Sequence, residues 1–357
     1  DPGIDHILIK KAIDTIHKQG GTVKELISLC GGLPDPQAAN NPLKYKFSWS
    51  PRGVLTAACN AALYLKNNVE IHINSGGSEL LQSAVTCPKL FQELGLGMEM
   101  LPNRNSIVYK DLYNVTEVDT ICRGTLRYDG WANVMHALHC MGLFNQENCL
   151  NISEDSGNEL TWGQYITMCI NDTGPASGTT SATVDGDELK LALSNYLQSK
   201  NVKVVREAVD ALDWLGLLSN KKLTSSAPMD ALCSLLQEKL QFEDGEKDMV
   251  AMYHTVLGCL PDGSYERHTS TLLAYGKIGG DTAMAATVGY TTVAAVELIL
   301  LDDFVAQSDK HCGVLIPTME AAYLPILERI QELGVTYTES MDRTDTYVSS
   351  MEMENVL

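Results

Sequence analysis

Residues 119–128 read DTICRGTLRY and residues 131–141 read WANVMHALHCM. The first stretch predicts a β-strand, and the second has the apolar spacing of a helix. Earlier segments continue the same alternation, with a helix over 6–19, a strand over 22–30, a helix over 51–66 and a strand over 69–73. Alternating strands and helices predict an α/β domain over residues 1–145.

The rest of the chain divides by composition. Residues 146–267 are first polar and turn-rich and then helical in pattern, with no convincing strand over 187–260, so we expect a largely helical domain inserted here. Residues 268–336 return to the α/β pattern, with a helix over 283–300, a strand over 313–317 and a helix over 323–333. The acidic, polar residues 337–357 predict a disordered tail.

Charge and composition exclude several classes of function. The chain has 357 residues and a net charge of −19, which argues against nucleic acid and anionic membranes as partners. The longest apolar run, Thr291–Leu301, is too short to span a bilayer. None of the ten cysteines forms a CxxC pair. His136, His139 and Cys140 have no further converging ligand nearby in the sequence. We therefore expect reduced thiols and no metal site.

Three arginines stand out in this acidic protein. Arg104 lies in a loop after a predicted strand, and Arg123 and Arg127 lie four residues apart on the strand 119–128. Residues at this spacing point to the same face, about 13 Å apart on a regular strand. Such a pair suits a long ligand with separated carboxylates, which guanidinium groups bind in a bidentate manner. The alternative is that these arginines pair with the protein's own acids.

Two segments end in predicted helix N-termini. The segment from Asp1 to His6 is a turn entering a helix, where Asp1 either caps the helix or holds an amine or a cofactor. The segment 45–50 alternates aromatic residues before Pro51, and the amides that follow favour an anion, although such a loop can also simply pack its rings. The dinucleotide fingerprint GxGxxG does not occur in the sequence.

These segments together resemble the glutamate-forming saccharopine dehydrogenases. The motifs that carry the resemblance occur in order as DPGIDH at 1–6, CGGLP at 30–34, NPL at 41–43, YKFSWS at 45–50, PNR at 102–104, RGTLRY at 123–128, LTW at 160–162, ALDWLG at 211–216, EKDM at 246–249, LAYG at 273–276 and PILER at 325–329. The resemblance spans residues 1–336. The LTW motif and the helical middle look most like the dehydrogenase half of animal aminoadipic semialdehyde synthase.

The resemblance implies a fold and an activity. It implies a mixed-sheet domain for substrate binding and dimerisation, with a helical insertion and a C-terminal return. The family's N-terminal Rossmann domain is absent from these residues. The implied reaction oxidises saccharopine with NAD or NADP and water to glutamate and aminoadipic semialdehyde. A homodimer and a mitochondrial matrix location are also implied, with the cytoplasm as the alternative. The competing hypothesis is a non-catalytic module that binds saccharopine or dimerises.

The resemblance also assigns site residues. Saccharopine-binding positions fall on Asp1, Arg104, Thr125, Leu126 and Arg127, and contacts to the nicotinamide cofactor fall on Asp1, Pro2, Gly3 and Ser50. Arg123 is added from strand geometry alone. Asp1, Asp5 and His6 are candidates for proton transfer because they lie beside the turn expected to bind the substrate amine.

Overall fold

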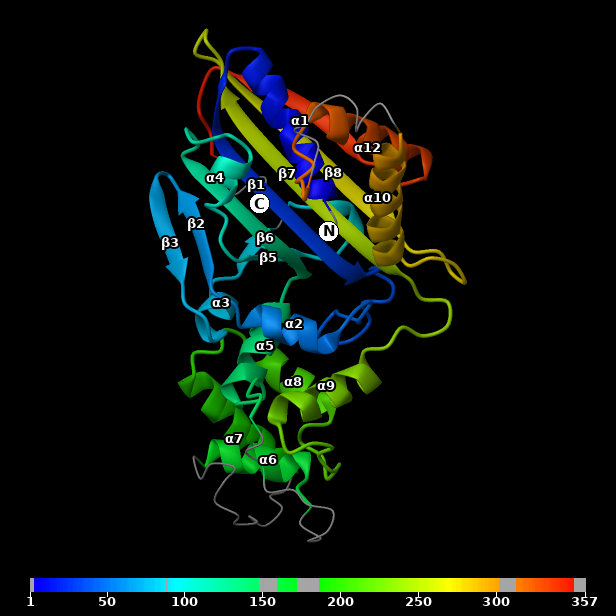
Figure 1. Ribbon diagram of the computed structural model, residues 1–357. Helices are drawn as coiled ribbons and strands as arrows, with labels where there is room; N and C mark the ends of the chain where they lie inside the picture. The colour runs from blue at the N-terminus through cyan, green and yellow to red at the C-terminus, as the bar shows by residue number, and fades with distance from the viewer. Residues whose placement is uncertain are drawn as a thin grey trace.

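The computed structural model describes residues 3–87, 89–147, 150, 159–171, 186–301 and 313–349. Two residues with expected roles in the site, Asp1 and Pro2, lie outside these ranges. The described chain forms a large mixed sheet with helices on one face and a group of helices at one end (Figure 1). It is therefore a mixed α/β fold, as the sequence predicts.

The sheet contains nine strands of the described chain. Seven of them follow the order β3-β2-β6-β1-β7-β8-β9, while β4 pairs with β5 and β5 pairs with β6. The central strands β1 and β6 run parallel, and β7 and β8 continue the sheet in the antiparallel sense. The strands are β1 Thr22–Pro34, β2 Ala62–Lys66, β3 Val69–Ile73, β4 Val85–Cys87, β5 Met98–Pro102, β6 Thr120–Tyr128, β7 Asp248–Cys259, β8 Tyr265–Tyr275 and β9 Thr338–Thr344.

Three helices cover one face of the sheet, namely α1 (Ile4–Lys18), α10 (Ala283–Leu300) and α12 (Glu320–Glu332), as Figure 1 shows. The isoleucines of α1 at positions 9, 13 and 16 recur every three or four residues and are fully buried against β1 and β7. The helix ends at Lys18, and the chain turns away at Gly20, whose φ of 77° favours glycine. The start of α1 is thereby held over the carboxyl-terminal half of β1.

The remaining helices gather at one end of the sheet. In Figure 1, α5 to α9 lie below the strands, with α2 and α3 between the two parts. Their apolar faces share one continuous core with the opposite face of the sheet, from Ile27 and Leu29 to Leu232 and Leu236. The helices are α2 Pro51–Ala58, α3 Ser78–Gln82, the short 3₁₀ turn η1 Gln92–Leu94, α4 Tyr109–Leu112, α5 Trp131–Cys140, α6 Trp162–Ile170, α7 Gly186–Ser199, α8 Val205–Leu215 and α9 Pro228–Lys239.

Several expectations from the sequence are wrong. The segment 187–260 was expected to lack strands, yet β7 begins at Asp248 and is a central strand. Nearly all residues of β7 are buried, whichever face of the sheet their side chains point to. The sequence of β7 therefore lacks the alternation of apolar and polar residues that a half-exposed strand shows. Residues 51–66 form α2 and then β2 instead of one helix. The expected strand at 313–317 is not regular structure.

The tail beyond residue 337 also differs from the expectation of disorder. Residues 338–344 form β9, which pairs along its whole length with β8. The following residues cross the far face of the sheet, where Ser349 donates a hydrogen bond to the buried carboxylate of Glu25 at 2.5 Å. The backbone pairing and this buried contact order a segment whose composition alone suggests none. Residues 350–357 lie outside the described ranges.

Among the described helices, α10 is the one long and apolar enough to cross a membrane. Its 18 residues have a mean hydropathy of 1.6, and 28% of it is buried. It extends the apolar run that the sequence placed at Thr291–Leu301. Its buried side carries Ala283, Thr287 and Leu298 and packs against α12 and β7, while Val293 and Leu300 are among the exposed residues of the opposite side. One side of α10 therefore belongs to the core.

Candidate active site

The strand β6 brings Arg123, Thr125 and Arg127 to the helix-covered face of the sheet. In the parallel register, Ser28 of β1 lies opposite Arg123 and Cys30 lies opposite Thr125. These residues line a cavity of about 160 Å³. The cavity is also lined by Gly31 and Gly32 of β1, by Gly124 of β6 and by one residue from each of four other segments, namely Trp49, Asn103, Val250 and Met284. The two arginines predicted to share a face therefore do share a cavity.

Glycine is required where β1 passes beside β6. A Cβ atom at Gly31 would lie 2.8 Å from the carbonyl oxygen of Leu126, and one at Gly32 would lie 2.5 Å from the side chain of Met284. At Gly31 the obstacle is the backbone of β6, which leaves no room for a side chain, whereas the terminal methyl group of Met284 beside Gly32 could move aside. Gly31 of the CGGLP motif thus lets the two strands approach closely beside the cavity.

Arg127 is a buried cation held by aromatic rings. Its side chain is only 5% exposed, and its guanidinium lies over Tyr45 and Trp131, with centroid distances of 5.2 and 4.9 Å. Nη1 donates to the carbonyl oxygen of Leu126 at 2.7 Å, and Nε has no hydrogen-bond partner in the described chain. No carboxylate of the described residues forms an ion pair with Arg127. The aromatic loop before α2 therefore orients an arginine.

Arg123 behaves differently because it is paired. Its Nη2 donates to Oδ2 of Asp5 at 2.7 Å, and its Nη1 donates to the hydroxyl of Tyr109 at 2.6 Å. The guanidinium also lies over the Tyr109 ring at 4.5 Å from the centroid. Arg123 therefore pairs with an acid of the protein itself, which was the alternative left open by the sequence. Its side chain nevertheless lines the cavity.

Asp5 and His6 lie in the network that holds Arg123 and are not among the residues that line the cavity. Burial by itself raises the pKa of the Asp5 carboxyl. The charges of His6, Arg123 and His254 and the hydrogen bond from Arg123 more than offset this, so the pKa is lowered. Nδ1 of His6 lies 2.5 Å from the hydroxyl of Tyr113, and burial lowers the pKa of the imidazole. Asp5 is therefore a buried anion that positions Arg123.

The remaining expected site residues lie in different surroundings. Thr125 lines the cavity, whereas the side chain of Leu126 is buried on the other face and only its carbonyl reaches Arg127. Arg104 is exposed in a left-handed turn with a φ of 54° and is not among the residues that line the cavity, although its neighbour Asn103 is.

Gly3 and Ser50 both lie at helix starts. Gly3 is the N-cap of α1, with a φ of 94°, and lines a separate apolar cavity of about 400 Å³ beside α10. Ser50 is the exposed N-cap of α2, and its hydroxyl accepts a hydrogen bond from the Gly53 amide at 3.2 Å. The described chain offers these helix starts to a cofactor but no glycine-rich phosphate loop.

The sequence reading missed two polar residues beside the cavity. Oγ of Ser28 lies 3.1 Å from Nδ1 of His254, which is 1% exposed and whose Nε2 has no hydrogen-bond partner in the described chain. Ser28 lines the arginine cavity, and His254 lines a second cavity of about 250 Å³ between α1 and β9. Had residues 248–259 been recognised as a strand antiparallel to β1, His254 would have fallen opposite Ser28.

The histidines and cysteine considered as metal ligands make ordinary contacts. Nε2 of His136 lies 3.0 Å from the side-chain amide of Gln82 and 3.6 Å from Sγ of Cys140, and the His136 ring stacks on His139. Within the described ranges, no group of three or more histidine, cysteine or acidic side chains could hold a metal ion.

We predict that His254 makes the fold sensitive to mild acid. Burial lowers the pKa of His254 to about 4, whereas a histidine in an unfolded chain titrates near pH 6.5. Between these values the unfolded chain binds a proton that the folded chain excludes. The free energy of unfolding should therefore fall by about 3 kcal/mol as the pH drops through this window. Urea unfolding at a series of pH values measures this slope.

The control is His254→Gln, which lacks the titrating imidazole. Its unfolding free energy should change much less with pH across the same window. Parallel pH profiles for the two proteins would show that other groups cause the acid sensitivity.

Comparisons with known proteins place these residues in a family context. The sequence model of the saccharopine dehydrogenase C-terminal domain matches residues 1–335. The chain is 36% identical to saccharopine dehydrogenase [NADP(+), L-glutamate-forming] of Saccharomyces cerevisiae, over 93% of this chain and 70% of that protein. It is 36% identical to the mitochondrial alpha-aminoadipic semialdehyde synthase of Bos taurus, over 95% of this chain but 34% of that protein.

A solved structure agrees with these sequence matches. The apo histidine-tagged saccharopine dehydrogenase (L-Glu forming) from Saccharomyces cerevisiae superposes with a TM-score of 0.79 at 34% identity, covering 96% of this chain and 72% of that chain. The chain thus spans about 70% of the length of this yeast protein and about a third of the length of the bovine one.

Proposed function

We propose, because the chain belongs to the saccharopine dehydrogenase family, that it is the saccharopine-binding part of an oxidoreductase of lysine catabolism. The proposed reaction transfers a hydride from saccharopine to a nicotinamide nucleotide. Water then hydrolyses the resulting imine to glutamate and aminoadipic semialdehyde. About 30% of the yeast relative lies outside the match, so the complete reaction is proposed for a protein that includes such a portion.

The observation that carries this proposal is the buried guanidinium of Arg127. A buried charge without an opposite charge costs several kcal/mol, so folded proteins keep one mainly where a ligand supplies the partner. Arg127 lines the cavity, has an Nε without a partner and has no carboxylate against it in the described chain. A substrate carboxylate would complete the site.

The roles proposed for the other residues follow from their positions. The charge of Arg123 is already neutralised by Asp5. Arg123 would therefore contribute mainly a guanidinium group held in a fixed direction, and less an unpaired positive charge. Thr125 offers a hydroxyl between the two arginines. Arg104, exposed beside Asn103, would meet a carboxylate at the rim, and Leu126 acts through its carbonyl on Arg127. Fixing the carboxylates would orient the reacting C–H bond towards the nicotinamide.

The nucleotide itself would be held mostly by residues outside this chain. Gly3 and Ser50 are proposed to contact its nicotinamide end, together with Asp1 and Pro2, and helix starts of this kind favour polar and anionic groups. When bound, the nucleotide accepts the hydride. Asp1 remains a proposed proton-transfer residue, whereas Asp5 and His6 are proposed to act only through Arg123 and Tyr113.

The relatives' names guide the remaining proposals. The name of the yeast protein includes NADP(+), and that of the bovine protein includes the word mitochondrial. For this chain we propose NAD as the cofactor, with NADP as the alternative. We also propose a mitochondrial matrix location, with the cytoplasm as alternative, and a homodimer. The competing proposal is a module that binds saccharopine without catalysis, which the Arg127 cavity supports equally well because that cavity contains no nucleotide-binding loop.

The activity is tested by assaying the chain alone and fused to the portion of the yeast enzyme that lies outside the match. Formation of reduced nicotinamide is followed with saccharopine and either NAD or NADP. We expect turnover by the fusion and none by the chain alone. Saccharopine binding without turnover by a folded, nucleotide-binding fusion would favour the non-catalytic module.

Replacing Arg104 by alanine should have a small effect compared with replacing a buried arginine. A contact between an exposed arginine and a carboxylate contributes about 0.2–1 kcal/mol, which corresponds to a rise in the Kd for saccharopine of up to about fivefold. Calorimetric titration of the variant measures this change. A loss of about a hundredfold or more would mean that the loop folds over the ligand and buries Arg104.

A further inference from the structure

A row of polar residues crosses the sheet from strand to strand beneath α1. In the pairing register, Arg123 of β6 lies opposite Ser28 of β1, Ser28 opposite His254 of β7, His254 opposite Ser270 of β8, and Ser270 opposite Glu339 of β9. Directly opposed residues belong to the same face of a sheet. Arg123 and Ser28 line the arginine cavity, and the other three residues line the second cavity, so the row connects the two.

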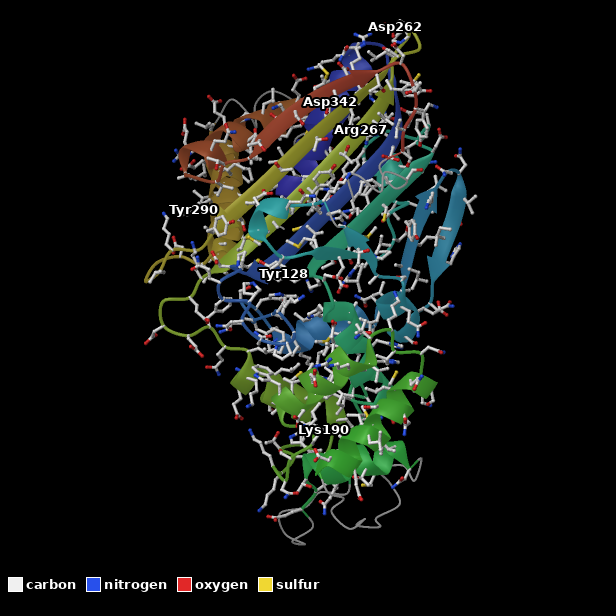
Figure 2. All side chains as sticks on the ribbon, turned by 180° about the vertical axis from the view of Figure 1, so that it is seen from behind. Tyr128, Lys190, Asp262, Arg267, Tyr290 and Asp342 are labelled. Atoms are coloured by element: carbon white, nitrogen blue, oxygen red, sulfur yellow. The ribbon has the colours of Figure 1, made fainter. Side chains whose placement is uncertain are left out.

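The second cavity, of about 250 Å³, lies between this row and α1. Figure 2 views the sheet from behind and labels Arg267 and Asp342, which lie opposite each other on β8 and β9. Successive side chains of a strand point to opposite faces. Their neighbours His268 and Met341 accordingly line the cavity together with residues of α1.

His254 is a buried member of the row whose hydrogen bonding is incomplete. It is 1% exposed, its Nδ1 lies 3.1 Å from Oγ of Ser28, and its Nε2 has no partner in the described chain. The cation of Arg123 beside Ser28 favours a serine oxygen that faces the guanidinium and a hydroxyl that donates to Nδ1. The imidazole is neutral at pH 7, because burial lowers its pKa to about 4, so its one proton is then on Nε2. A ligand in the second cavity can supply the missing acceptor.

The other end of the row offers a negative charge. Oε2 of Glu339 accepts a hydrogen bond from Nζ of Lys11 at 2.6 Å, and Oε1 has no hydrogen-bond partner among the described residues. The cavity also has an apolar wall, formed by Leu8 and Ala12 of α1 and Val256 of β7. A donor, a carboxylate and an apolar surface therefore lie within three neighbouring strands and one helix.

We propose that this cavity is a second binding site, for a free α-amino acid with an apolar side chain. Its carboxylate would accept hydrogen bonds from Nε2 of His254 and the hydroxyl of Ser270, and its ammonium would pair with Glu339. Neighbouring strands are about 4.8 Å apart, which suits the short separation of the two charges in an amino acid. The apolar wall would receive the side chain.

Occupancy of this site should weaken saccharopine binding through Ser28. A carboxylate on Nε2 of His254 holds the proton there, so Nδ1 stays the acceptor of the Ser28 hydroxyl. That hydroxyl is then not available to a saccharopine carboxylate in the arginine cavity. The loss of one hydrogen bond corresponds to a rise in the Kd for saccharopine of about fivefold. This consequence rests on the proposed function, whereas the site itself is tested without saccharopine.

The site is tested by titrating the chain with L-norleucine, whose side chain is unbranched and apolar. Labelling the eight histidines with ¹⁵N lets NMR follow the ring nitrogens of His254, which His254→Gln identifies by their loss. We expect Nε2 to shift with a Kd on the order of millimolar for so small a ligand. Hexanoate, which lacks the ammonium, and pentylamine, which lacks the carboxylate, should bind at least tenfold more weakly. No shift with norleucine, or equal binding of either analogue, would overturn the proposal.

Three variants locate the bound norleucine. Glu339→Gln should weaken its binding about fivefold, because the ammonium loses a charged partner. The matched control is Glu320→Gln, since Glu320 also pairs with a lysine of α1, Lys18, at 2.6 Å but does not line the cavity. This control and Arg127→Met should leave the Kd for norleucine unchanged. Binding that depends on Arg127 and not on Glu339 would place norleucine in the arginine cavity and overturn the second site.

The coupling is tested by calorimetric titration of saccharopine at increasing norleucine concentrations. The Kd for saccharopine should rise and level off at about fivefold, and Ser28→Ala should remove the dependence on norleucine. A Kd that rises without limit would show competition for one cavity, which contradicts the proposal, and a Kd that norleucine leaves unchanged would overturn the coupling. A chain that binds norleucine but not saccharopine would contradict the proposed function and support the second site.

Discussion

Replacing Arg127 by methionine should weaken saccharopine binding at least about thirtyfold without destabilising the fold. Methionine has a similar length and can pack between Tyr45 and Trp131, whose rings now enclose the guanidinium. Removing a buried charge that lacks a carboxylate partner should leave the free energy of unfolding unchanged or raise it by about 1 kcal/mol. Losing a buried partner of a carboxylate should weaken binding by 2 kcal/mol or more, at least about thirtyfold.

Calorimetry and urea unfolding of the same preparation measure the two effects together. Arg127→Lys is the companion variant, because it keeps the charge but loses the planar, stacked donor, and it should bind about tenfold more weakly than the unchanged chain. A methionine variant that loses several kcal/mol of stability would show that Arg127 is structural, with its charge satisfied within the protein.

Replacing Asp5 by asparagine should destabilise the fold, in contrast to Arg127→Met. Asp5 is 1% exposed and forms the ion pair with Arg123, so removing its charge leaves a cation in the interior without its anion. Breaking a buried pair on one side costs about 3–5 kcal/mol. The free energy of unfolding, measured in urea, should fall by about that amount, and saccharopine should bind more weakly because Arg123 loses its fixed direction.

The control is Asp210→Asn, which removes the acid of the exposed pair between Arg206 and Asp210 on α8. Exposed pairs contribute little, so this change should stay within about 0.5 kcal/mol. If Asp5→Asn also stays within that range, the buried pair does not stabilise the fold in the way proposed.

The family and the face of the site could be predicted from the sequence. Eleven short motifs identified the saccharopine dehydrogenases, and the family model and the solved yeast structure confirm this identification. The spacing of Arg123 and Arg127 correctly placed both on one face of a strand, because alternation along a strand is a local property.

The partners of those arginines could not be predicted, because they come from distant parts of the chain. Asp5 meets Arg123 across 118 residues, and Tyr45 reaches Arg127 from a loop. Spacing alone therefore left open which arginine pairs within the protein. The strand β7 was missed for a related reason, since a strand buried on both faces shows no alternation and can be mistaken for part of a helical region.

The site is tested most directly by calorimetric titration of the chain with saccharopine, alongside glutamate and lysine. We expect saccharopine to bind at a single site, glutamate to bind more weakly because it has fewer carboxylates for the arginines, and Arg127→Met to remove the saccharopine signal. Saccharopine binding that is absent from the folded chain, or equally strong in Arg127→Met, would contradict the assignment of this cavity to the substrate.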